Sequence, residues 1–350
     1  MRIGIDTRLQ NETGVGRYIR NLVRWLPVVA PRHEFISIHP SVPWHGIREQ
    51  VEMPRIIARH NIDLLHVPYF NVPFFYRQPF VVTIHDMIID QFPTGRASTL
   101  FPPLYWMKRW GYKMIMKNAT SRARVIIVPT TAVCNELISL YPDVKPSSVN
   151  VIYEGADEFA NTDEKKPTGI LMPYYLYVGN AYPHKNLERL VLAAPNFLDV
   201  SRNEKLVFVG KHDVFYETLK QFVHENGCGS LVHFAGEVSH DELGRLYRHA
   251  QAVIIPSLSE GFGLPMVEAM RVGVPVISSA IPVLREVGCS VCTFNPHSVE
   301  SMMNAFKRFR GLPKKTIREC IIAGQKKSEK FSWKTMAQKT VNIYERCLDL

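Results

Sequence analysis

The sequence predicts an α/β fold built from two doubly wound parallel sheets, one in each half of the chain. Short β-branched runs alternate with helix-length amphipathic stretches throughout, which is typical of α/β units on parallel sheets. At 350 residues the chain is also longer than one hydrophobic core usually becomes, so two domains are expected. Open sheets of this kind bind ligands at the carboxyl ends of their strands, and we expect the two domains to face each other across a cleft.

Candidate strands occupy both halves of the chain in equal number. The first set comprises residues 2–5, 34–39, 63–67, 80–86, 124–130 and 149–155, and the second comprises residues 174–179, 205–210, 231–237, 252–257, 274–279 and 290–295. Helical patterns lie between them, for example at 186–198 and 239–250. The alternation of strand and helix favours two Rossmann-like domains.

The boundary between the two domains is indicated by composition. Residues 160–173 read ANTDEKKPTGILMP, with two prolines, one glycine and no clear hydrophobic period, which is typical of a linker. We place the N-terminal Rossmann-like domain at residues 1–160, the linker at 161–173 and the C-terminal Rossmann-like domain at 174–330.

Charge and hydropathy limit the classes of protein to consider. The net charge of +10 suggests anionic partners, but no nucleic-acid-reading motif accompanies it, so nucleic acid is disfavoured. No stretch approaches the roughly 18 consecutive apolar residues of a membrane span. Residues 1–6 lead straight into a strand pattern without the features of a signal peptide, so we expect a cytoplasmic location.

A basic and aromatic segment stands out in the first half of the chain. Residues 104–117 read LYWMKRWGYKMIMK, in which Trp106, Trp110 and Met114 recur every fourth residue beside Arg109, Lys113 and Lys117. On a helix this pattern suits peripheral contact with the headgroups of an anionic membrane through Trp106 to Lys117, at the inner face. It equally suits a stripe that faces the core and has a solvated flank.

The segment 259–270, SEGFGLPMVEAM, combines two carboxylates with a candidate phosphate site. Gly261 and Gly263 allow a sharp turn after a buried strand, and Pro265 suits the first position of a helix that Gly273 would end. Backbone N–H groups of Gly263, Leu264 and Met266 would then be unpaired at a helix N-terminus, where they bind phosphate.

Glu260 and Glu268 flank this turn and need not face a phosphate. Carboxylates placed beyond its two ends can accept hydrogen bonds from hydroxyl groups. A ligand with a sugar at each end and a diphosphate in the middle satisfies both requirements, and such a ligand is a nucleotide sugar. The alternative is an ordinary βα turn with two surface glutamates.

These motifs identify a resemblance to the retaining glycosyltransferases of family four (glycosyl transferases group 1), which have the GT-B fold. The segment 260–279, EGFGLPMVEAMRVGVPVISS, resembles the family's signature of two glutamates separated by seven residues. Further resemblances lie in TGVGRYIRNL at 13–22, VVTIHDM at 81–87 and YYLYVGNAYPHKNLERLVLA at 174–193. The segment 331–348 resembles the closing helix, which implies that residues 331–350 pack back on the N-terminal, acceptor-side domain.

The resemblance implies roles for several donor-binding residues of the C-terminal domain. Glu268 would hold the nucleotide ribose, and Glu260 would bind the donor sugar and help to orient its anomeric carbon. Main-chain atoms near Gly261, Gly263 and Leu264 would hold phosphate or sugar oxygens. Gly236 to Val238 would meet the base through backbone atoms.

Lys185 follows a strand and begins a helical pattern, where its ammonium can stabilise a leaving diphosphate. Its alternative is an ordinary lysine of a first helical turn. Many members of the family carry an arginine at the place of Asn180 or His184, so this chain departs from the pattern. Lys185 would be the only fixed cation of this loop unless His184 becomes protonated, and Asn180 remains a candidate donor contact.

The N-terminal domain offers a second set of candidates. Gly14 and Gly16 would let the backbone approach the diphosphate, with a simple turn as the alternative. The third glycine of a dinucleotide fingerprint is replaced by Ile19, which disfavours a nicotinamide-dependent enzyme. His85 ends a strand, and in the family a histidine there lies near the donor sugar, where it can donate to a hydroxyl or carry a proton. A structural histidine is the alternative.

Three further residues, Arg17, Tyr69 and Asn71, are candidates for the acceptor side. No Asp-x-Asp motif or carboxylate–histidine cluster with metal spacing occurs, so we expect no metal and no cofactor besides the nucleotide-sugar co-substrate.

The predicted reaction is transfer of a hexose with retention, in which Glu260, His85 and Lys185 act as catalytic residues. The resemblance is greatest to mannosyltransferases that use GDP-mannose in bacterial surface polysaccharide and lipopolysaccharide biosynthesis, with a glycan or lipid-linked oligosaccharide as acceptor. A sugar-nucleotide epimerase of the same fold and a non-catalytic nucleotide-sugar-binding subunit are alternatives. The first needs an acid/base carboxylate set that cannot be placed here, and Glu260, Glu268 and Lys185 disfavour the second.

Overall fold

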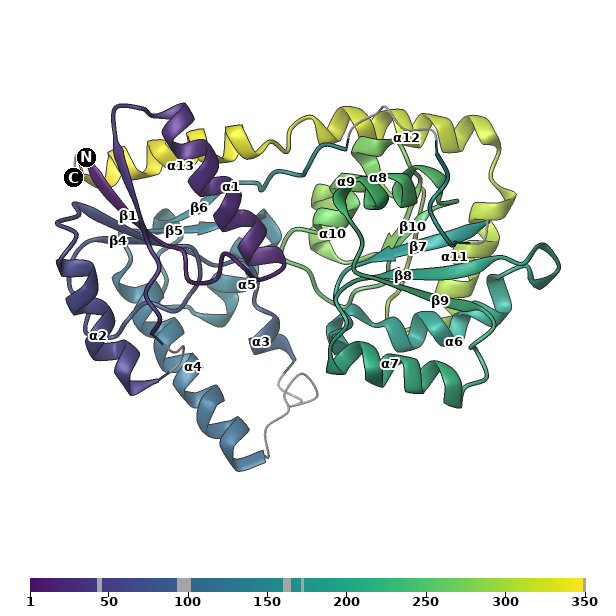
Figure 1. The fold of residues 1–350 in the computed structure, drawn as a ribbon, viewed down its shortest axis with the longest axis horizontal. Helices are drawn as coiled ribbons and strands as arrows, with labels where there is room; N and C mark the ends of the chain where they lie inside the picture. The colour runs from purple at the N-terminus through teal and green to yellow at the C-terminus, as the bar shows by residue number, and fades with distance from the viewer. Residues whose placement is uncertain (43–45, 93–101, 160–164, 171–172, 349–350) are drawn as a thin grey trace. The chain divides into compact units, whose positions relative to one another are not determined.

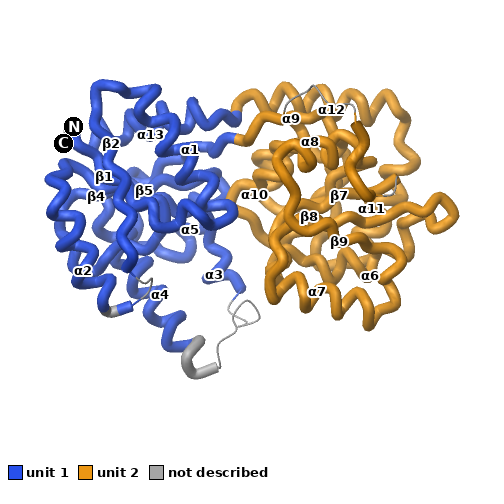
Figure 2. Tube along the Cα trace, viewed as in Figure 1, with its two compact units in different colours: residues 1–155, 331–350 blue, residues 156–330 orange. Residues whose placement is uncertain are grey.

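The computed structural model describes residues 1–42, 46–92, 102–159, 165–170 and 173–348 (Figure 1). The chain divides into two compact units. Unit 1 comprises Met1–Gly155 with Phe331–Leu350, and unit 2 comprises Ala156–Lys330 (Figure 2). Of the linker placed at 161–173, residues 161–164 and 171–172 lie outside the described part of the chain.

Unit 1 contains a six-stranded sheet in the order β2-β1-β3-β4-β5-β6, with every neighbouring pair parallel. The strands are β1 (Arg2–Asp6), β2 (Glu34–Ile38), β3 (Leu64–Val67), β4 (Phe80–Thr83), β5 (Val125–Val128) and β6 (Val149–Val151). The helices are α1 (Gly14–Val29), α2 (Ile47–Ala58), α3 (Ile88–Gln91), α4 (Pro102–Arg122), α5 (Thr131–Leu140) and α13 (Trp333–Leu348). All the strands expected in the first half are confirmed.

Unit 2 repeats this plan with the order β12-β11-β10-β7-β8-β9, again parallel. Its strands are β7 (Tyr174–Val178), β8 (Lys205–Val209), β9 (Val232–Gly236), β10 (Val253–Ile255), β11 (Val276–Ser279) and β12 (Cys292–Phe294). Its helices are α6 (Leu187–Phe197), α7 (Val214–Glu225), α8 (His240–His249), α9 (Leu264–Val272), α10 (Pro282–Val287), α11 (Val299–Gly311) and α12 (Lys314–Ser328). The strands expected in the second half are confirmed as well.

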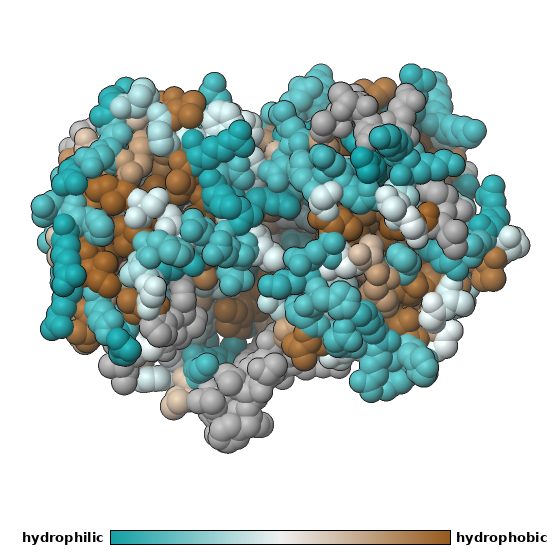
Figure 3. Space-filling view, viewed as in Figure 1, coloured by the Kyte–Doolittle hydropathy of each residue, from teal (hydrophilic) through white to brown (hydrophobic). Residues whose placement is uncertain are grey.

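The central strands of both sheets are buried on both faces because helices cover them. In unit 2 the side chains of Tyr175, Leu206 and Ile254 are fully buried in one core cluster. Phe197 of α6 and Phe306 of α11 stack in this cluster with their ring centroids 3.6 Å apart. Such contacts fix each helix on its sheet and so fix the loops at the strand ends. In the view of Figure 3, hydrophilic side chains cover much of the surface and hydrophobic ones lie scattered between them.

The strand orders place one switch point in each sheet. In unit 2 the chain leaves β9 and returns to place β10 beside β7, on the other side from β8. In unit 1 the corresponding neighbours are β1 and β3. Loops that follow the two strands of a switch point run in opposite directions, which leaves space for a ligand at the carboxyl ends.

The C-terminal helix α13 belongs to unit 1, where it lies alongside α1 (Figure 1). Tyr344 of α13 is fully buried, and its hydroxyl lies 2.5 Å from Nδ1 of His66 on β3. Gly155 permits this packing, because a β-carbon at that position would lie 2.3 Å from the backbone nitrogen of Trp333. The last helix is therefore part of the core of unit 1.

Candidate active site

The loops after β7 and β10 bring Lys185 and Glu260 together at the switch point of unit 2. The Lys185 ammonium donates to both carboxylate oxygens of Glu260, at 2.8 and 2.9 Å. Both side chains are largely buried, with exposed fractions of 16% and 12%. Lys185 and Glu260, which belong to separate sequence motifs, thus form one charged pair.

The surroundings of this pair fix its charge state. Ser257 donates a hydrogen bond of 2.6 Å to Glu260. Burial alone would raise the pKa of Glu260, but the charge of Lys185 and the hydrogen bonds from Lys185 and Ser257 lower it. Burial and the neighbouring charge of Lys185 lower the pKa of His184 to about 4. His184 is therefore neutral at pH 7, and Lys185 is the cation among these loop residues.

Asn186 holds the loop that carries Lys185 against the neighbouring strand ends. It adopts a left-handed conformation with φ of 62°, which asparagine tolerates better than most residues. Its side-chain amide donates to the carbonyls of Pro256 and Pro296, at 2.9 and 2.8 Å. These bonds tie the loop after β7 to the segments that follow β10 and β12, and so position Lys185.

Asn180 lies directly after β7 and its position suits a contact with a ligand. Tyr177 donates a hydrogen bond of 2.6 Å to its backbone carbonyl. Its side-chain oxygen is buried and has no hydrogen-bond partner among the residues that the structure describes. Buried polar atoms are normally paired, so this oxygen can accept a hydrogen bond from a ligand.

Helix α9 begins and ends where its sequence predicts. Gly263 precedes it with φ of 87°, Pro265 lies in its first turn, and Gly273 ends it with φ of 86°. One detail of the prediction is wrong: the N–H of Met266 is not unpaired, because it donates to the carbonyl of Gly263 at 2.9 Å. If an anion binds at this terminus, its N–H donors must therefore come from residues that precede Met266.

Glu268 lies inside α9 and is almost completely buried, with 1% of its surface exposed. The hydroxyl of Tyr247 on α8 donates to one of its carboxylate oxygens at 2.7 Å. Tyr247 is itself fully buried. This hydrogen bond fixes the carboxylate in one orientation, as a group that is to recognise ribose hydroxyls would require.

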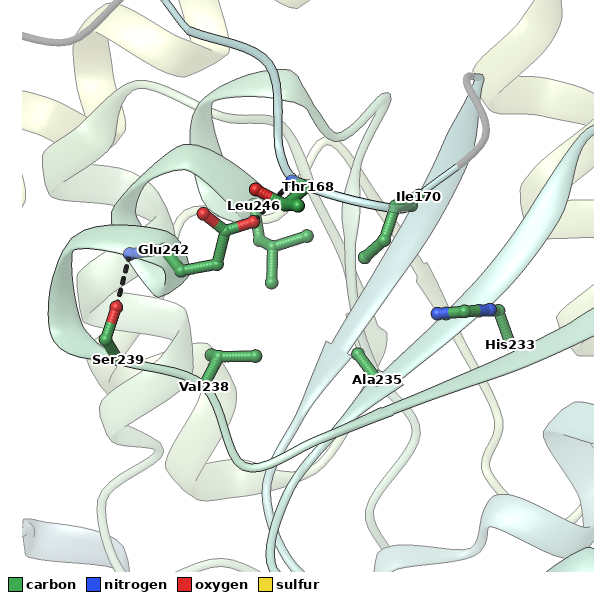
Figure 4. A pocket seen from close by; sticks show the side chains of 8 residues that line it. All are labelled: Thr168, Ile170, His233, Ala235, Val238, Ser239, Glu242 and Leu246. Atoms are coloured by element: carbon green, nitrogen blue, oxygen red, sulfur yellow. Dashed lines mark hydrogen bonds between the residues drawn. The ribbon is translucent and has the colours of Figure 1, made fainter.

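The end of β9 carries Gly236 and Val238, which were expected to meet the base. Gly236 adopts φ of 72°, and its carbonyl accepts a hydrogen bond from the N–H of Gly210. That carbonyl is therefore already engaged. Val238 lines a cavity of about 310 Å³, which Figure 4 shows beside β9. Two of the polar groups there serve the fold, since Glu242 accepts from the backbone of Thr168 and Ser239 caps α8.

In unit 1, His85 follows β4 and is 7% exposed. Its Nδ1 lies 2.8 Å from a carboxylate oxygen of Glu154, which follows β6, and its Nε2 lies 3.1 Å from the carbonyl oxygen of Pro68, which follows β3. Tyr18 of α1 meets the ring edge-on with centroids 4.8 Å apart. His85 is thus contacted by three groups of unit 1, which come from α1 and from the segments after β3 and β6.

The two glycines at the start of α1 have different surroundings. A β-carbon at Gly16 would lie 2.7 Å from the carbonyl oxygen of Gln10 and 2.8 Å from that of Leu9. A β-carbon at Gly14 would meet nothing within 4 Å. Gly16 is therefore needed for packing of the turn, whereas Gly14 leaves open space that a ligand could approach.

Arg17 and Tyr69 are half-buried in unit 1, whereas Asn71 is buried. Asn71 is 1% exposed, and its amide donates to Glu49 at 2.5 Å. Arg8 also donates to Glu49 and to Asp6 within this buried cluster. The amide nitrogen of Asn71 is thus engaged by a buried carboxylate, whereas its side-chain oxygen is buried with no hydrogen-bond partner among the described residues, so its place on the acceptor side stays a prediction.

Four residues that contact or adjoin candidate site residues within their own unit were not identified from the sequence: Glu154 in unit 1, and Asn186, Tyr247 and Ser257 in unit 2. Ser257 and Asn186 adjoin recognised motifs, so their closeness to Glu260 and Lys185 was a usable signal. Glu154 contacts His85, 69 positions away, and Tyr247 contacts Glu268, 21 positions away. No local sequence pattern connects the members of either pair. Among the described residues, no group of three or more His, Cys, Asp or Glu side chains could hold a metal ion.

Two doubly wound parallel sheets with polar groups gathered at the carboxyl ends of their strands are the architecture of GT-B enzymes. The fold agrees with solved structures: a sucrose-phosphate synthase from Thermosynechococcus elongatus matches with a TM-score of 0.78 and 19% identity, covering 99% of this chain and 98% of the other.

The family follows from the sequence comparison. Residues 24–158 match the family described as Glycosyltransferase Family 4, and residues 161–309 match Glycosyl transferases group 1. The chain therefore belongs to the family 4 glycosyltransferases, also described as glycosyl transferases group 1. It is similar to an O-antigen chain mannosyltransferase of Salmonella typhimurium, with 26% identity over 82% of this chain and 75% of the relative. It is also similar to an MMP alpha-(1->4)-mannosyltransferase of Mycolicibacterium hassiacum, with 27% identity over 77% of this chain and 66% of the relative.

Proposed function

We propose that the chain is a retaining mannosyltransferase that moves mannose from GDP-mannose to a glycan or lipid-linked oligosaccharide in surface polysaccharide biosynthesis. The observation that carries this proposal is the pair of Lys185 and Glu260 at the switch point of unit 2, 2.8 Å apart. Mannose is favoured because both relatives described above are named mannosyltransferases.

The pair suggests how the donor is bound. A nucleotide sugar that enters this site brings a diphosphate to the ammonium of Lys185 and sugar hydroxyls to the carboxylate of Glu260. Lys185 then exchanges the carboxylate for the charge of the diphosphate, and Glu260 exchanges the ammonium for hydroxyl donors, so neither group is left without a hydrogen-bond partner in a buried place. Glu268, oriented by Tyr247, supplies acceptors for the ribose hydroxyls.

The reaction that we propose breaks the bond between the anomeric carbon and the diphosphate oxygen. Negative charge collects on the leaving diphosphate, where Lys185 and the N-terminus of α9 stabilise it. The acceptor hydroxyl attacks on the face that the diphosphate leaves, and its proton passes to a phosphate oxygen. Fixed donors and Lys185 supply the positive charge, so the proposal includes no metal ion.

Donor binding and product analysis test this proposal. Thermal unfolding is measured with guanosine, uridine and adenosine diphosphates and their sugars at equal concentrations, since a bound ligand stabilises the folded state according to its dissociation constant. GDP-mannose is expected to raise the melting temperature most, and transfer is expected to yield an α-mannoside, with or without a chelator. Preference for another base would overturn the donor, and a β-product would overturn retention.

The exposed side chains of helix α4 favour a membrane surface as a further binding partner. Trp106, Trp110 and Met107 are 57%, 66% and 63% exposed, while Tyr112 and Met116 on the opposite side of the helix are buried. The aromatic stripe therefore does not face the core, which corrects one of the two interpretations of the sequence. None of the helices in the described part of the chain has the length and hydropathy required to cross a bilayer.

The charges on α4 favour an anionic lipid surface. Lys108, Lys113 and Lys117 are exposed, and the last two share the side of the helix that carries Trp110 and Met114. Lys117 pairs with Asp143 at 3.2 Å, but both side chains are at least 70% exposed, so this pair contributes little. We propose that this face of α4 rests on a membrane whose lipid headgroups are negatively charged.

A further inference from the structure

His85 makes hydrogen bonds that require a proton on each ring nitrogen. A carboxylate oxygen of Glu154 lies 2.8 Å from Nδ1, and the carbonyl oxygen of Pro68 lies 3.1 Å from Nε2. A carbonyl and an ionised carboxylate can only accept hydrogen bonds. A neutral imidazole has a single N–H and can serve only one of them, whereas an imidazolium donates to both.

We propose that Glu154 is a positioning residue that holds His85 as an imidazolium, and that this cation ties together the ends of β3, β4 and β6. The effect on catalysis rests on the proposed function, whereas the charge state of His85 and its hydrogen bonds do not. Glu154 stands 69 residues from His85 in the chain, and its contact arises because β6 and β4 both neighbour β5 in the sheet.

The groups around His85 are consistent with a charged ring. Glu154 and Asp86 contribute negative charge, and Tyr18 and His66 are the remaining titratable neighbours. Burial opposes the charged form, but the hydrogen bond and charge of Glu154, with smaller contributions from Asp86 and the Pro68 carbonyl, raise the pKa of His85. Burial and the charge of His85 lower the pKa of His66 to about 3.

His66 and His85 therefore differ in charge and in the hydrogen-bond partners that they face. His66 is neutral and bonds Tyr344 through Nδ1 and Thr83 through Nε2, both of which are hydroxyl groups that can donate or accept. His85 faces acceptors only, and the side chain of Glu154 is 7% exposed. A buried carboxylate without a cation would be costly, and the imidazolium of His85 supplies that cation.

The consequence for function concerns the loop that begins at Pro68. The N–H at Nε2 holds the Pro68 carbonyl, and Tyr69, a candidate for the acceptor side, is the next residue. Deprotonation of His85 would release one of the two bonds and loosen this loop. If the proposed function holds, transfer is lost as the pH rises through the pKa of His85, and in contrast to a general base, His85 is active in its protonated form.

The test is a nitrogen-15 NMR titration of the histidine side chains in the full chain without ligand. His85 is assigned by its absence from His85→Gln, and Glu154→Gln is compared with Glu12→Gln, which changes an exposed carboxylate of the same unit. The wild type and Glu12→Gln are expected to show two protonated nitrogens at pH 6. Glu154→Gln is expected to lower the pKa of His85 by about one unit or more.

Two results would overturn the proposal. The first is a single protonated nitrogen on His85 in the wild type at pH 6, which would mean that the ring donates only one of its two hydrogen bonds; this measurement does not require Glu154→Gln to fold. The second is an unchanged titration in Glu154→Gln.

Transfer assays over the same pH range give an independent result. The pH at which activity is lost is expected to fall in Glu154→Gln, which a merely structural role would not cause. If no transfer is found with any sugar donor, the proposed function fails, while the NMR titration still decides the state of His85.

Discussion

The ammonium of Lys185 donates to both carboxylate oxygens of Glu260, although the two residues stand 75 positions apart in the chain. The contact exists because β7 and β10 are neighbours at the switch point of unit 2, so the loops that follow them start side by side. A charged pair at this place can be opened by a ligand that carries charge and hydroxyl groups of its own.

Replacing Glu260 tests the role of its carboxylate in transfer. Glu260→Gln keeps the size of the side chain but removes its charge and two strong acceptor sites. We expect turnover to fall by about 10²–10³, the usual effect of losing one group that stabilises the transition state. The control is Glu300→Gln, an exposed carboxylate of α11. Near wild-type turnover in Glu260→Gln, measured under saturating donor, would contradict the assignment.

The stability of the Lys185–Glu260 pair depends on pH. Lys185→Met leaves a largely buried carboxylate without its cation, and we expect the free energy of unfolding at pH 7 to fall by about 1–3 kcal/mol. Because the pKa of Glu260 is lowered in the folded state, this stabilisation is complete above the ordinary pKa of glutamate and is lost as the pH falls through the folded value. Denaturant unfolding at several pH values measures it.

The control for this prediction is Lys211→Met, which removes an exposed lysine of unit 2. The difference between the wild type and Lys185→Met should shrink toward acid pH, and that of the control should stay near zero. A deficit in Lys185→Met that is equal at all pH values would mean that the lost stability comes from packing and not from charge.

Gly14 and Gly16 provide a matched pair for separating packing from ligand binding. Gly16→Ala places a β-carbon within 2.8 Å of two backbone carbonyls, and we expect it to lower stability by about 1–3 kcal/mol. Gly14→Ala fits into open space, so we expect unchanged stability and weaker donor binding. Melting temperatures and donor dissociation constants measure the two effects. Unchanged donor affinity in Gly14→Ala would remove Gly14 from the donor site.

The exposed face of α4 should bind anionic vesicles. Sedimentation with vesicles of phosphatidylglycerol and phosphatidylcholine is compared with phosphatidylcholine alone, and binding is expected only to the former and to weaken with salt. Lys113→Gln with Lys117→Gln, which removes the two lysines on the face of Trp110, should lower affinity by about 30-fold, at about 1 kcal/mol for each basic residue. Trp110→Ser should weaken binding while leaving the salt dependence unchanged.

The matched control for α4 removes the same charge elsewhere. Lys314→Gln with Lys315→Gln changes two exposed lysines of α12 and should leave vesicle binding close to that of the wild type. Equal loss in both double variants would assign the binding to net charge and not to α4.

The features that could be predicted from the sequence are those that depend on residues close together in the chain. Strand positions followed from β-branched runs, and the limits of α9 followed from Pro265 and Gly273, because proline and glycine impose their conformations without help from distant residues. The two glutamates of the motif at 260–268 could be selected for the same reason.

Tertiary structure decided what each of these groups touches. Glu154 reaches His85 and Tyr247 reaches Glu268 only because the order of the strands and the packing of the helices place them side by side. The stripe of Trp106 and Trp110 is compatible with either side of a helix until the sheet packs against one side, and Asn71 meets Glu49 although the two residues stand 22 positions apart in the chain. Sequence periodicity thus determined which residues share a face, whereas contacts between distant residues depend on the assembly of the whole sheet, which no local pattern encodes.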